Sequence, residues 1–317
     1  MLEVFVCNVG DGDSILLTER REGAPDYTVL VDAGRPYVEP GEGSLRKEAL
    51  YFLKARGVRS LDRMILSHPH IDHVGGAERI LRAIPTKRLT MLTLPPEHPV
   101  WISPSFTSGD KTQNGLRHML NLLDSIASAA RETGCALEQA AAGTERLTDR
   151  LSMTTILPKI GFVRRQADLF KKLYAGEPVN DEDSFRVSKE RNQCSLMHRF
   201  SYAGRSVLLT GDRYASEWED EAIPPCDVFK LPHHGDGKSV TKKALKRIAP
   251  MIAIVSCQSD PRAGKDRPNA EALALTQAAA ATVLCTENRE MPTLPAASYN
   301  GVCVTITEDG TIGCRTE

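Results

Sequence analysis

Residues 67–76 read Ser-His-Pro-His-Ile-Asp-His-Val-Gly-Gly and directly follow an apolar run at Met64–Leu66. Three of the chain's eight histidines and one aspartate lie together in this short stretch. Histidine is the commonest protein ligand for zinc and related ions, and a carboxylate beside it adds an oxygen ligand that such sites often include. The alternative is a polar turn with coincidental histidines, but four ligand-capable groups so close together are hard to explain by packing. The stretch therefore predicts a metal-binding loop at the end of a buried strand.

Further acids and histidines follow other strand-like runs. Residues 206–212, SVLLTGD, read as a strand ending in Gly-Asp, and residues 227–235, DVFKLPHHG, read as a strand ending in a histidine pair. Near the N-terminus, the tight turn VGDGD at 9–13 joins two predicted strands. Another strand, from Thr28, ends in Asp32, for which two roles remain open: a carboxylate that caps a turn, or one that orients a metal-bound histidine.

The pattern H-x-H-x-D-H followed by Val-Gly-Gly resembles the signature of the metallo-β-lactamase-fold hydrolases. The chain is most similar to stand-alone relatives of the hydrolase domain of ComEC-type DNA-uptake proteins. The motifs that carry this resemblance are V-G-x-G-D at 9–13, N-x-x-S-L at 192–196, L-L-x-G-D at 208–212 and H-H-G at 233–235. The resemblance implies an α/β (α+β) fold in which two β-sheets face each other and helices cover both, a four-layer αββα sandwich.

The resemblance also implies a set of metal ligands. His68 and His70 would bind one ion, Asp72 and His73 the other, and Asp212 would bridge both. One of His233 and His234 would complete the second ion, while the other contacts substrate or supports a ligand; the sequence leaves open which does which. The predicted metal ligands are His68, His70, Asp72, His73, Asp212, His233 and His234, and the predicted catalytic residues are His70, Asp72 and Asp212.

The expected cofactor is one or two Zn²⁺ ions, with Mn²⁺ as an alternative. A bound metal lowers the pKa of its water from 15.7 to about 7, which gives a hydroxide nucleophile at neutral pH. Two ions about 3.5–4 Å apart can hold that hydroxide and also stabilise the oxyanion and the leaving group.

The chain departs from the family pattern at two places. Many members supply a further histidine to the first ion just before the strand that begins here near Cys194, where this chain has Asn192 instead. We expect that ion to be held weakly, or by water and Asn192, while the nearby His198 belongs to the strand. At Arg267-Pro268 relatives tend to have His-Pro, so Arg267 would favour a phosphate, which a guanidinium grips with paired hydrogen bonds. The predicted substrate-binding residues are Asn192, Arg267 and His234.

Three groups of basic residues bear on the substrate: residues 164–172, residues 238–247, and a loop containing Arg262, Lys265 and Arg267. They either line the rim of the site or form solvated faces balanced by acids. Aromatic residues make up only 5% of the chain, and no run of interleaved aromatics supports base recognition. The leading hypothesis is a phosphodiesterase or nuclease acting on phosphodiesters or nucleic acid. The alternatives are a hydrolase of small esters, lactones or thioesters, and a non-catalytic, metal-bound regulator.

Composition and charge limit the classes of protein to which the chain can belong. The 317 residues carry a net charge of −1, so no overall charge draws the chain to nucleic acid or membranes. The N-terminus reads as a strand rather than a signal peptide, and no apolar run approaches the roughly 20 residues that span a bilayer. The eight cysteines form no C-x-x-C pair, which indicates free thiols and a cytoplasmic protein. We expect one domain over residues 1–317, with an insertion or lid at about 95–190.

Overall fold

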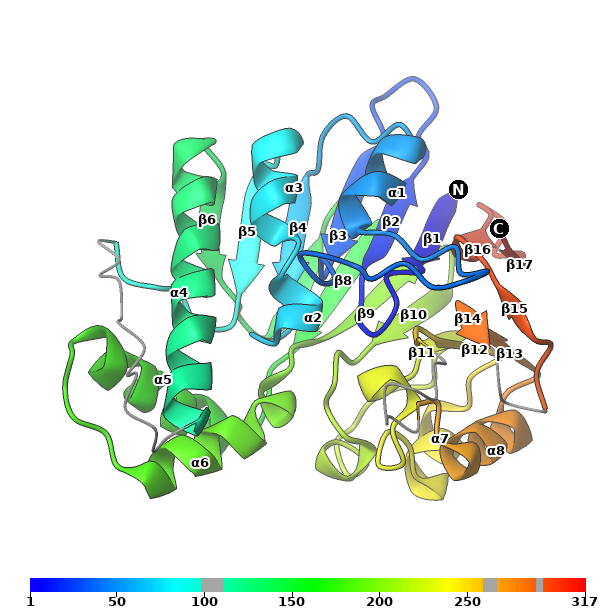
Figure 1. The fold of residues 1–317 in the computed structure, drawn as a ribbon. Helices are drawn as coiled ribbons and strands as arrows, with labels where there is room; N and C mark the ends of the chain where they lie inside the picture. Colours follow the sequence, from blue (N-terminus) through cyan, green and yellow to red (C-terminus); the bar gives the residue numbers. More distant parts are fainter. Residues whose placement is uncertain (98–110, 259–266, 289–292) are drawn as a thin grey trace.

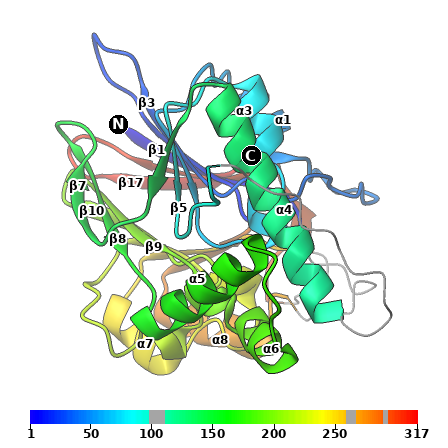
Figure 2. The same cartoon turned by 90° about the vertical axis from the view of Figure 1, so that its left-hand side faces the viewer.

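Two mixed β-sheets pack face to face, and helices cover the outer face of each sheet (Figure 1, Figure 2). The computed structural model describes residues 1–97, 111–258, 267–288 and 293–317. This arrangement confirms the predicted αββα sandwich. Over the described ranges, no helix combines the length and the apolar composition that crossing a bilayer requires.

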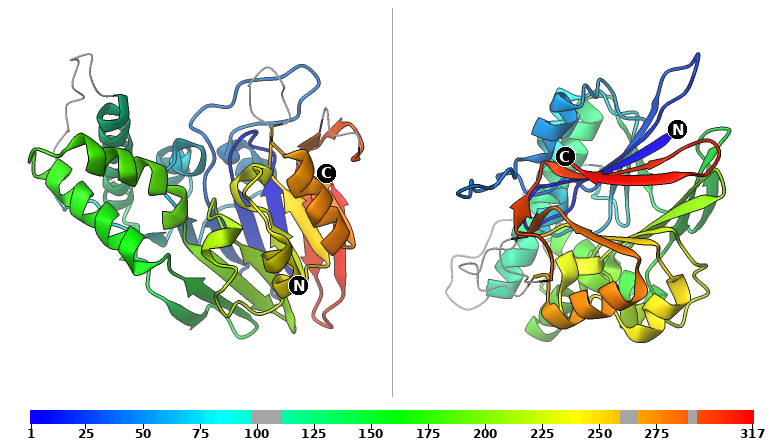
Figure 3. Two further views of the ribbon diagram at one scale, coloured as in Figure 1. Left: turned by 90° about the horizontal axis from the view of Figure 1, so that it is seen from below. Right: turned by 90° about the vertical axis from the view of Figure 1, so that its right-hand side faces the viewer.

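The first sheet contains both ends of the chain. Its first strand pairs with residues 301–306, and these pair with the last strand (Figure 3, right). In spatial order the strands are β17 (Ile312–Thr316), β16 (Gly301–Ile306), β1 (Leu2–Cys7), β2 (Ile15–Glu19), β3 (Tyr27–Val31), β4 (Arg63–Leu66), β5 (Arg88–Met91) and β6 (Ala136–Gln139). The pairs from β17 to β3 are antiparallel, and those from β3 to β6 are parallel.

The second sheet repeats this combination of antiparallel and parallel strands. In spatial order its strands are β13 (Thr282–Cys285), β12 (Ile252–Val255), β11 (Val228–Lys230), β10 (Arg205–Leu209), β9 (Met197–Tyr202), β8 (Leu151–Ile156) and β7 (Gly143–Arg146). The strands from β10 to β13 are parallel, and those from β7 to β10 are antiparallel. A separate two-stranded pair is formed by β14 (Glu287–Asn288) and β15 (Ala297–Ser298). In both large sheets, polar side chains follow the carboxyl ends of parallel strands, and this edge positions the site.

The helices divide between the two outer faces. On the first sheet lie α1 (Ala49–Ala55), α2 (Ile71–Val74), α3 (Ala77–Ala83) and α4 (Lys111–Glu132), while α6 (Asp181–Glu190) packs against α4 and α5 (Ile160–Tyr174) packs against α6. On the second lie α7 (Lys242–Ile248) and α8 (Ala270–Ala279). Three short 3₁₀ turns, η1 (Asn192–Cys194), η2 (Ala215–Glu217) and η3 (Pro232–Gly235), connect these elements.

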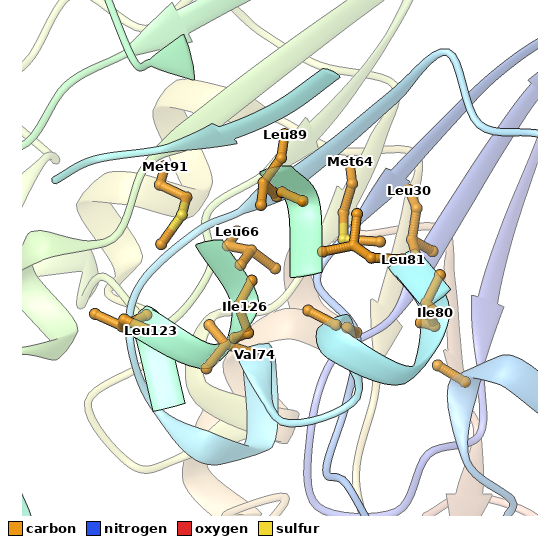
Figure 4. Packing of buried hydrophobic residues seen from close by; sticks show 14 of the residues in the cluster. Leu30, Met64, Leu66, Val74, Ile80, Leu81, Leu89, Met91, Leu123 and Ile126 are labelled. Atoms are coloured by element: carbon orange, nitrogen blue, oxygen red, sulfur yellow. The ribbon is translucent and has the colours of Figure 1, made fainter. Parts of the chain in front are cut away.

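Side-chain alternation along the strands produces three separate hydrophobic layers. Met64 and Leu66 of β4 point toward the helices, where they pack with Val74 of α2 and Ile126 of α4 (Figure 4). Ile65, the residue between them, instead packs between the two sheets. Burying a side chain of this size contributes about 1.5–3 kcal/mol. The strand that delivers the metal loop is therefore held firmly on both faces.

The sequence did not predict the short edge strands β6, β7 and β17, because their side chains are largely exposed and lack an apolar alternation. The strand expected to begin near Cys194 starts at Met197, after the turn η1. Within the predicted insertion at about 95–190, residues 98–110 lie outside the described residues and α4 begins at Lys111.

The charged segment at 161–191 forms helices α5 and α6 beside α4, on the side of the molecule away from α8 (Figure 3, left). Leu169, Phe170 and Leu173 of α5, and Val187 of α6, are buried in the hydrophobic layer that covers the first sheet. The single domain, and an insertion or lid at 95–190, stay predictions.

Candidate metal centre

The predicted metal loop leaves β4 and folds at once into the single turn of α2. His68 and His70 precede α2, and Asp72 and His73 lie on it. The backbone amide of His73 donates to the carbonyl of His70 at 2.9 Å, which fixes the spacing of these side chains. A side chain at Gly76 would place its Cβ 2.2 Å from the carbonyl oxygen of Ala33, so only glycine permits this close approach between the loop and the end of β3.

Asp212, in the loop after β10, brings the second half of the chain to this loop. His68, His70 and Asp212 form one group of potential ligand atoms, all within 4.8 Å of one another. Nε2 of His68 lies 3.0 Å from Nδ1 of His70 and 3.6 Å from Oδ2 of Asp212. These spacings suit side chains that share one ion about 2 Å from each.

A second group contains Asp72, His73 and His234, again within 4.8 Å of one another. Nε2 of His234 lies 3.6 Å from Oδ2 of Asp72, and Nε2 of His73 lies 3.2 Å from Oδ1 of Asp212. Asp212 thus presents one oxygen to each group. The structure brings together six of the seven predicted ligands in the arrangement that a bridged pair of ions would need.

The adjacent histidines His233 and His234 face different surroundings. Both have positive φ angles, +47° and +56°, in the left-handed region that non-glycine residues rarely adopt. His234 is fully buried, and its Nδ1 lies 3.1 Å from the carbonyl oxygen of Ser256. His233 lies outside both groups: Nη2 of Arg267 is 2.6 Å and Nδ2 of Asn192 is 3.4 Å from its Nε2. Of the two, His234 is therefore the one that joins a group of potential ligand atoms, and His233 lies at the edge of the centre.

Asp32 supports the metal loop from behind. Its Oδ2 lies 2.8 Å from Nδ1 of His73, and its two oxygens accept hydrogen bonds of 2.7 Å from the amide and the hydroxyl of Ser67. A carboxylate on Nδ1 fixes the ring so that Nε2 is directed at the centre. Of the two roles open from the sequence, orientation of a histidine describes Asp32.

The centre is electrostatically polarised. Burial lowers the pKa of His68 well below its ordinary value, and it lowers the pKa of His70 to about 4, assisted by the charge of Arg191. For His73, burial also favours the neutral ring, but the carboxylates of Asp212 and Asp32 outweigh it and raise the pKa well above its ordinary value. Burial opposes ionisation of Asp212, yet the neighbouring histidines, with His73 first, hold its pKa well below the usual range. Without a metal, protonated imidazoles thus balance the carboxylates, and a divalent ion would displace those protons.

Unpartnered buried atoms test whether the residues fit a metal. Nε2 of His73 and Nε2 of His234 are buried and have no hydrogen-bond partner among the described residues. Nearly all buried polar atoms in proteins have such a partner, so these two nitrogens indicate a missing one. Both face carboxylate oxygens, the donor set that zinc and manganese accept. The residues therefore fit the implied ions.

Asn192 is the residue predicted to hold the first ion in place of a further histidine. Its Nδ2 lies 3.5 Å from the hydroxyl of Tyr214 as well as close to His233, and its Oδ1 has no hydrogen-bond partner among the described residues. The amide is thus positioned toward the side of the centre where His233 and Arg267 lie. His198 is buried between the sheets on β9, 3.3 Å from the hydroxyl of Thr155, and joins neither ligand group, as expected.

Several residues around the centre were not predicted from the sequence. Asp13 and Lys230 form a buried ion pair beside it. Asp11 lies 3.4 Å from a guanidinium nitrogen of Arg267 and 3.7 Å from one of Arg35. The VGDGD turn was the available signal for the two acids, because it carries carboxylates directly before a buried strand.

The basic groups have different surroundings. Arg165 pairs with Glu190, and Lys243 on α7 pairs with Asp220, so both belong to solvated faces balanced by acids. Arg267 also lies near acids, Asp11 at 3.4 Å and Asp236 at 3.9 Å, but it differs in reaching His233 at the edge of the centre. Arg262 and Lys265 lie outside the described residues.

Comparison with known proteins agrees with this architecture. A sequence model of the metallo-beta-lactamase superfamily matches residues 8–259. Over 301 residues the chain is 28% identical to ComE operon protein 3 of Bacillus subtilis (strain 168), a match covering 90% of this chain and 32% of that protein. The chain therefore spans about a third of the length of that relative.

Two solved structures with similar folds have low sequence identity to this chain. The metallo-beta-lactamase fold protein YhfI from Bacillus subtilis superposes with a TM-score of 0.48 at 11% identity, covering 90% of this chain and 96% of that one. Tm1679, a metal-dependent hydrolase of the beta-lactamase superfamily, gives 0.47 at 12% identity over 97% of this chain and 100% of that one. From the match over residues 8–259, the chain belongs to the metallo-beta-lactamase superfamily of metal-dependent hydrolases.

Proposed function

We propose that the chain is a phosphodiesterase that acts on nucleic acid or on smaller phosphodiesters. The observation that carries the proposal is the position of Arg267 at the edge of the metal centre, where its guanidinium lies 2.6 Å from Nε2 of His233. A planar guanidinium matches two phosphate oxygens with paired hydrogen bonds, which an ester or lactone carbonyl does not require.

Arg35 adds a second positive charge on the same side. Its Nη2 lies 4.0 Å from Oδ2 of Asp72 and 3.7 Å from Oδ2 of Asp11. Asp11 thus lies between the guanidinium groups of Arg35 and Arg267, which come from opposite halves of the chain. An anionic substrate would meet both arginines beside the two ligand groups. The ComEC-type motifs found in the sequence support the same substrate class.

An apolar cleft would favour the alternative of a small ester, lactone or thioester substrate. The apolar cavity beside His68, lined by Leu66, Met91 and Phe170 among others, has a volume of about 20 Å³, which is room for about one water molecule. A larger, mostly apolar pocket of about 410 Å³ adjoins it at Thr93 and Phe170. The substrate panel below therefore includes acyl substrates.

Two bound divalent ions would supply an activated water and neutralise negative charge that develops on the phosphate. The chain's own residues determine where this happens. His68, His70 and Asp212 would hold the first ion, and Asp72, His73, His234 and Asp212 the second. Asp32 keeps the ring of His73 oriented, and Arg267 with Asn192 would fix the substrate oxygens on the side of His233.

The test is a substrate panel with the purified protein, loaded in parallel with Zn²⁺ and Mn²⁺. The panel contains bis(p-nitrophenyl) phosphate, single- and double-stranded DNA, RNA, a γ-lactone and an aryl thioester. We expect turnover of phosphodiesters and none of the acyl substrates. Turnover of the lactone or thioester alone would overturn the proposal, and complete inactivity of a metal-loaded protein would favour the non-catalytic alternative.

Variants of Arg267 test the proposed substrate contact. We expect Arg267→Ala to raise KM for phosphodiesters about tenfold or more, because a charge-assisted pair of hydrogen bonds is lost. Arg267→Lys should restore the charge but only part of the affinity, since an ammonium lacks the planar fork. Arg164→Ala, on an exposed turn of α5, is the matched control and should leave KM unchanged. Equal KM values for wild type and Arg267→Ala would remove Arg267 from the substrate site.

A further inference from the structure

A lysine and an aspartate form a fully buried ion pair next to the second group of ligands. Lys230, at the end of β11, contacts Oδ2 of Asp13 through its Nζ, and each side chain is only 1% exposed. Asp13 precedes β2 of the first sheet, whereas β11 belongs to the second, so the pair joins the two sheets. Burying two charges costs desolvation energy that their attraction often fails to offset, so stability alone does not account for this pair.

Asp13 lies behind the two histidines of the second group. Its Oδ1 is 3.5 Å from Nδ1 of His234, and its Oδ2 is 3.9 Å from Nδ1 of His73. In both rings the opposite nitrogen, Nε2, faces the carboxylates of the centre. Nδ1 of His73 is already bonded to Asp32 at 2.8 Å, whereas Nδ1 of His234 faces both the Ser256 carbonyl at 3.1 Å and Oδ1 of Asp13 at 3.5 Å.

The turn that carries Asp13 is docked on the metal loop. The amide of Asp13 donates to the carbonyl oxygen of Asp72 at 3.2 Å, and the hydroxyl of Ser256 donates to the carbonyl oxygen of Gly12 at 2.7 Å. A Cβ at Gly12 would lie 2.5 Å from the carbonyl oxygen of Asp72, so glycine is needed for this contact. Ser256 also accepts from His234 through its own carbonyl. The turn therefore touches both elements that carry ligands of the second group.

The positive charge of Lys230 balances the negative charge of the carboxylates that are buried around it. The buried cluster contains the carboxylates of Asp13, Asp32 and Asp212, with Asp72 beside them, and Lys230 places a permanent positive charge among them. Its ammonium contacts Oδ2 of Asp13, and the other carboxylate oxygen, Oδ1, faces Nδ1 of His234 at 3.5 Å, on the side of that ring opposite the centre.

We propose that Lys230 and Asp13 are positioning residues for the second metal site: Lys230 fixes the Asp13 carboxylate, and Asp13 holds the ring of His234 with Nε2 directed at the ion. This inference rests on the metal centre described above but not on any particular substrate. Lys230 acts through Asp13, so removing either residue should have the same consequence for metal binding.

The experiment measures metal affinity without substrate. Zn²⁺ is titrated in competition with a chromophoric chelator, in a His70→Ala background that disables the first group and leaves the second to be measured. We expect Asp13→Asn to weaken Zn²⁺ binding about 10- to 100-fold, the usual effect of losing the partner of a metal-bound histidine. Lys230→Met should weaken binding to a similar extent.

The double variant, Asp13→Asn with Lys230→Met, tests the dependence of one residue on the other. It also avoids an uncompensated buried charge, so it remains informative if Lys230→Met alone fails to fold. We expect its affinity to equal that of Asp13→Asn, because Lys230 has no further effect once Asp13 is neutral. Losses that multiply in the double variant would show that Lys230 acts independently and would overturn the inference, as would wild-type affinity in Asp13→Asn.

Arg63→Met is the matched control. Arg63 is another buried cation, at the opposite end of β4 from the metal loop, where it pairs with Glu145 at 2.7 Å. Its loss should lower stability while leaving the Zn²⁺ affinity of the folded protein unchanged. Failure of the metal centre itself gives a different result, because the protein without these substitutions would then bind no Zn²⁺.

Discussion

At the residue scale, the centre depends on carboxylates that serve two partners at once. Asp212 presents Oδ2 to His68 and Oδ1 to His73, and its Oδ1 also accepts the backbone amide of His233 at 3.1 Å. Asp32 similarly joins Ser67 to His73. Because each carboxylate is shared, one substitution disturbs both ligand groups.

Asp212→Ala should therefore abolish more than one ligand contact. We expect kcat on the best phosphodiester of the panel to fall by at least about 100-fold, the scale on which removal of one group that stabilises the transition state acts. Steady-state kinetics with metal analysis of the same samples is the measurement. Asp220→Asn, whose side chain is 78% exposed, is the control and should behave as wild type. Undiminished turnover in Asp212→Ala would exclude the bridging role.

His198 should make stability depend on pH. Burial, together with the charge of Arg63, lowers the pKa of its ring from 6.5 to about 3. The unfolded chain therefore binds more protons than the folded protein between these values. Stabilisation from the neutral ring is present above pH 6.5 and is lost as the pH falls toward 3, by as much as about 4 kcal/mol.

Urea unfolding of chelator-treated protein at pH 7.5, 5.5 and 4.5 measures this effect. We expect His198→Leu to flatten the decline in unfolding free energy between pH 6.5 and 4.5 relative to wild type. His118→Leu, at an exposed position on α4, should retain the wild-type decline. If the His198→Leu curve parallels wild type over this range, His198 is not the group responsible.

At the element scale, α5 and α6 form part of the helical layer of the sandwich. Phe170 of α5 is 2% exposed and shares a hydrophobic layer with Leu66 and Met91 of the first sheet. Phe185 of α6 is 53% exposed, and the ammonium of Lys189 lies 4.2 Å from its ring centroid. Substituting Phe170 therefore removes a buried contact, whereas substituting Phe185 removes only a surface contact.

We expect Phe170→Ala to lower the unfolding free energy by about 3–5 kcal/mol, the usual cost of a large cavity in a core. Phe185→Ala should change it by no more than about 1 kcal/mol, because it removes only a surface contact. Chemical denaturation of both variants provides the comparison. A loss below about 1 kcal/mol for Phe170→Ala would instead indicate that α5 is only loosely attached, as expected of a lid.

At the scale of the whole molecule, the centre lies where the two sheets meet. The first half of the chain supplies His68, His70, Asp72 and His73, and the second half supplies Asp212 and His234. Asp13 and Lys230 cross the same interface. Ions bound by both halves would tie the sheets together, and metal binding should therefore stabilise the entire fold.

Saturating metal should raise the melting temperature of chelator-treated protein. At a free concentration 100 times the dissociation constant, a ligand bound only to the folded state adds about 2.7 kcal/mol. Calorimetry with and without Zn²⁺ measures the shift, and Mg²⁺ serves as a control ion that histidine ligands disfavour. The shift should largely disappear in Asp212→Ala. An identical shift in that variant would place the bound metal elsewhere on the chain.

The sequence by itself determined the buried strands and the metal loop, because both depend on residues that are close together in the chain. The continuous apolar run Met64–Leu66 specifies a strand buried on two faces, and the spacing of His68, His70, Asp72 and His73 places four potential ligand side chains within six residues. Edge strands such as β7 were not predicted from the sequence, because exposed strands need no apolar pattern.

Only the tertiary structure distinguished the surroundings of His233 from those of His234, placed Asp32 beside His73, and brought Lys230 to Asp13. These outcomes depend on the direction of a left-handed turn and on contacts between residues far apart in the chain. The composition of the chain and the spacing of its motifs carry no information on such contacts. They arise when the two sheets pack and the buried charges must find partners.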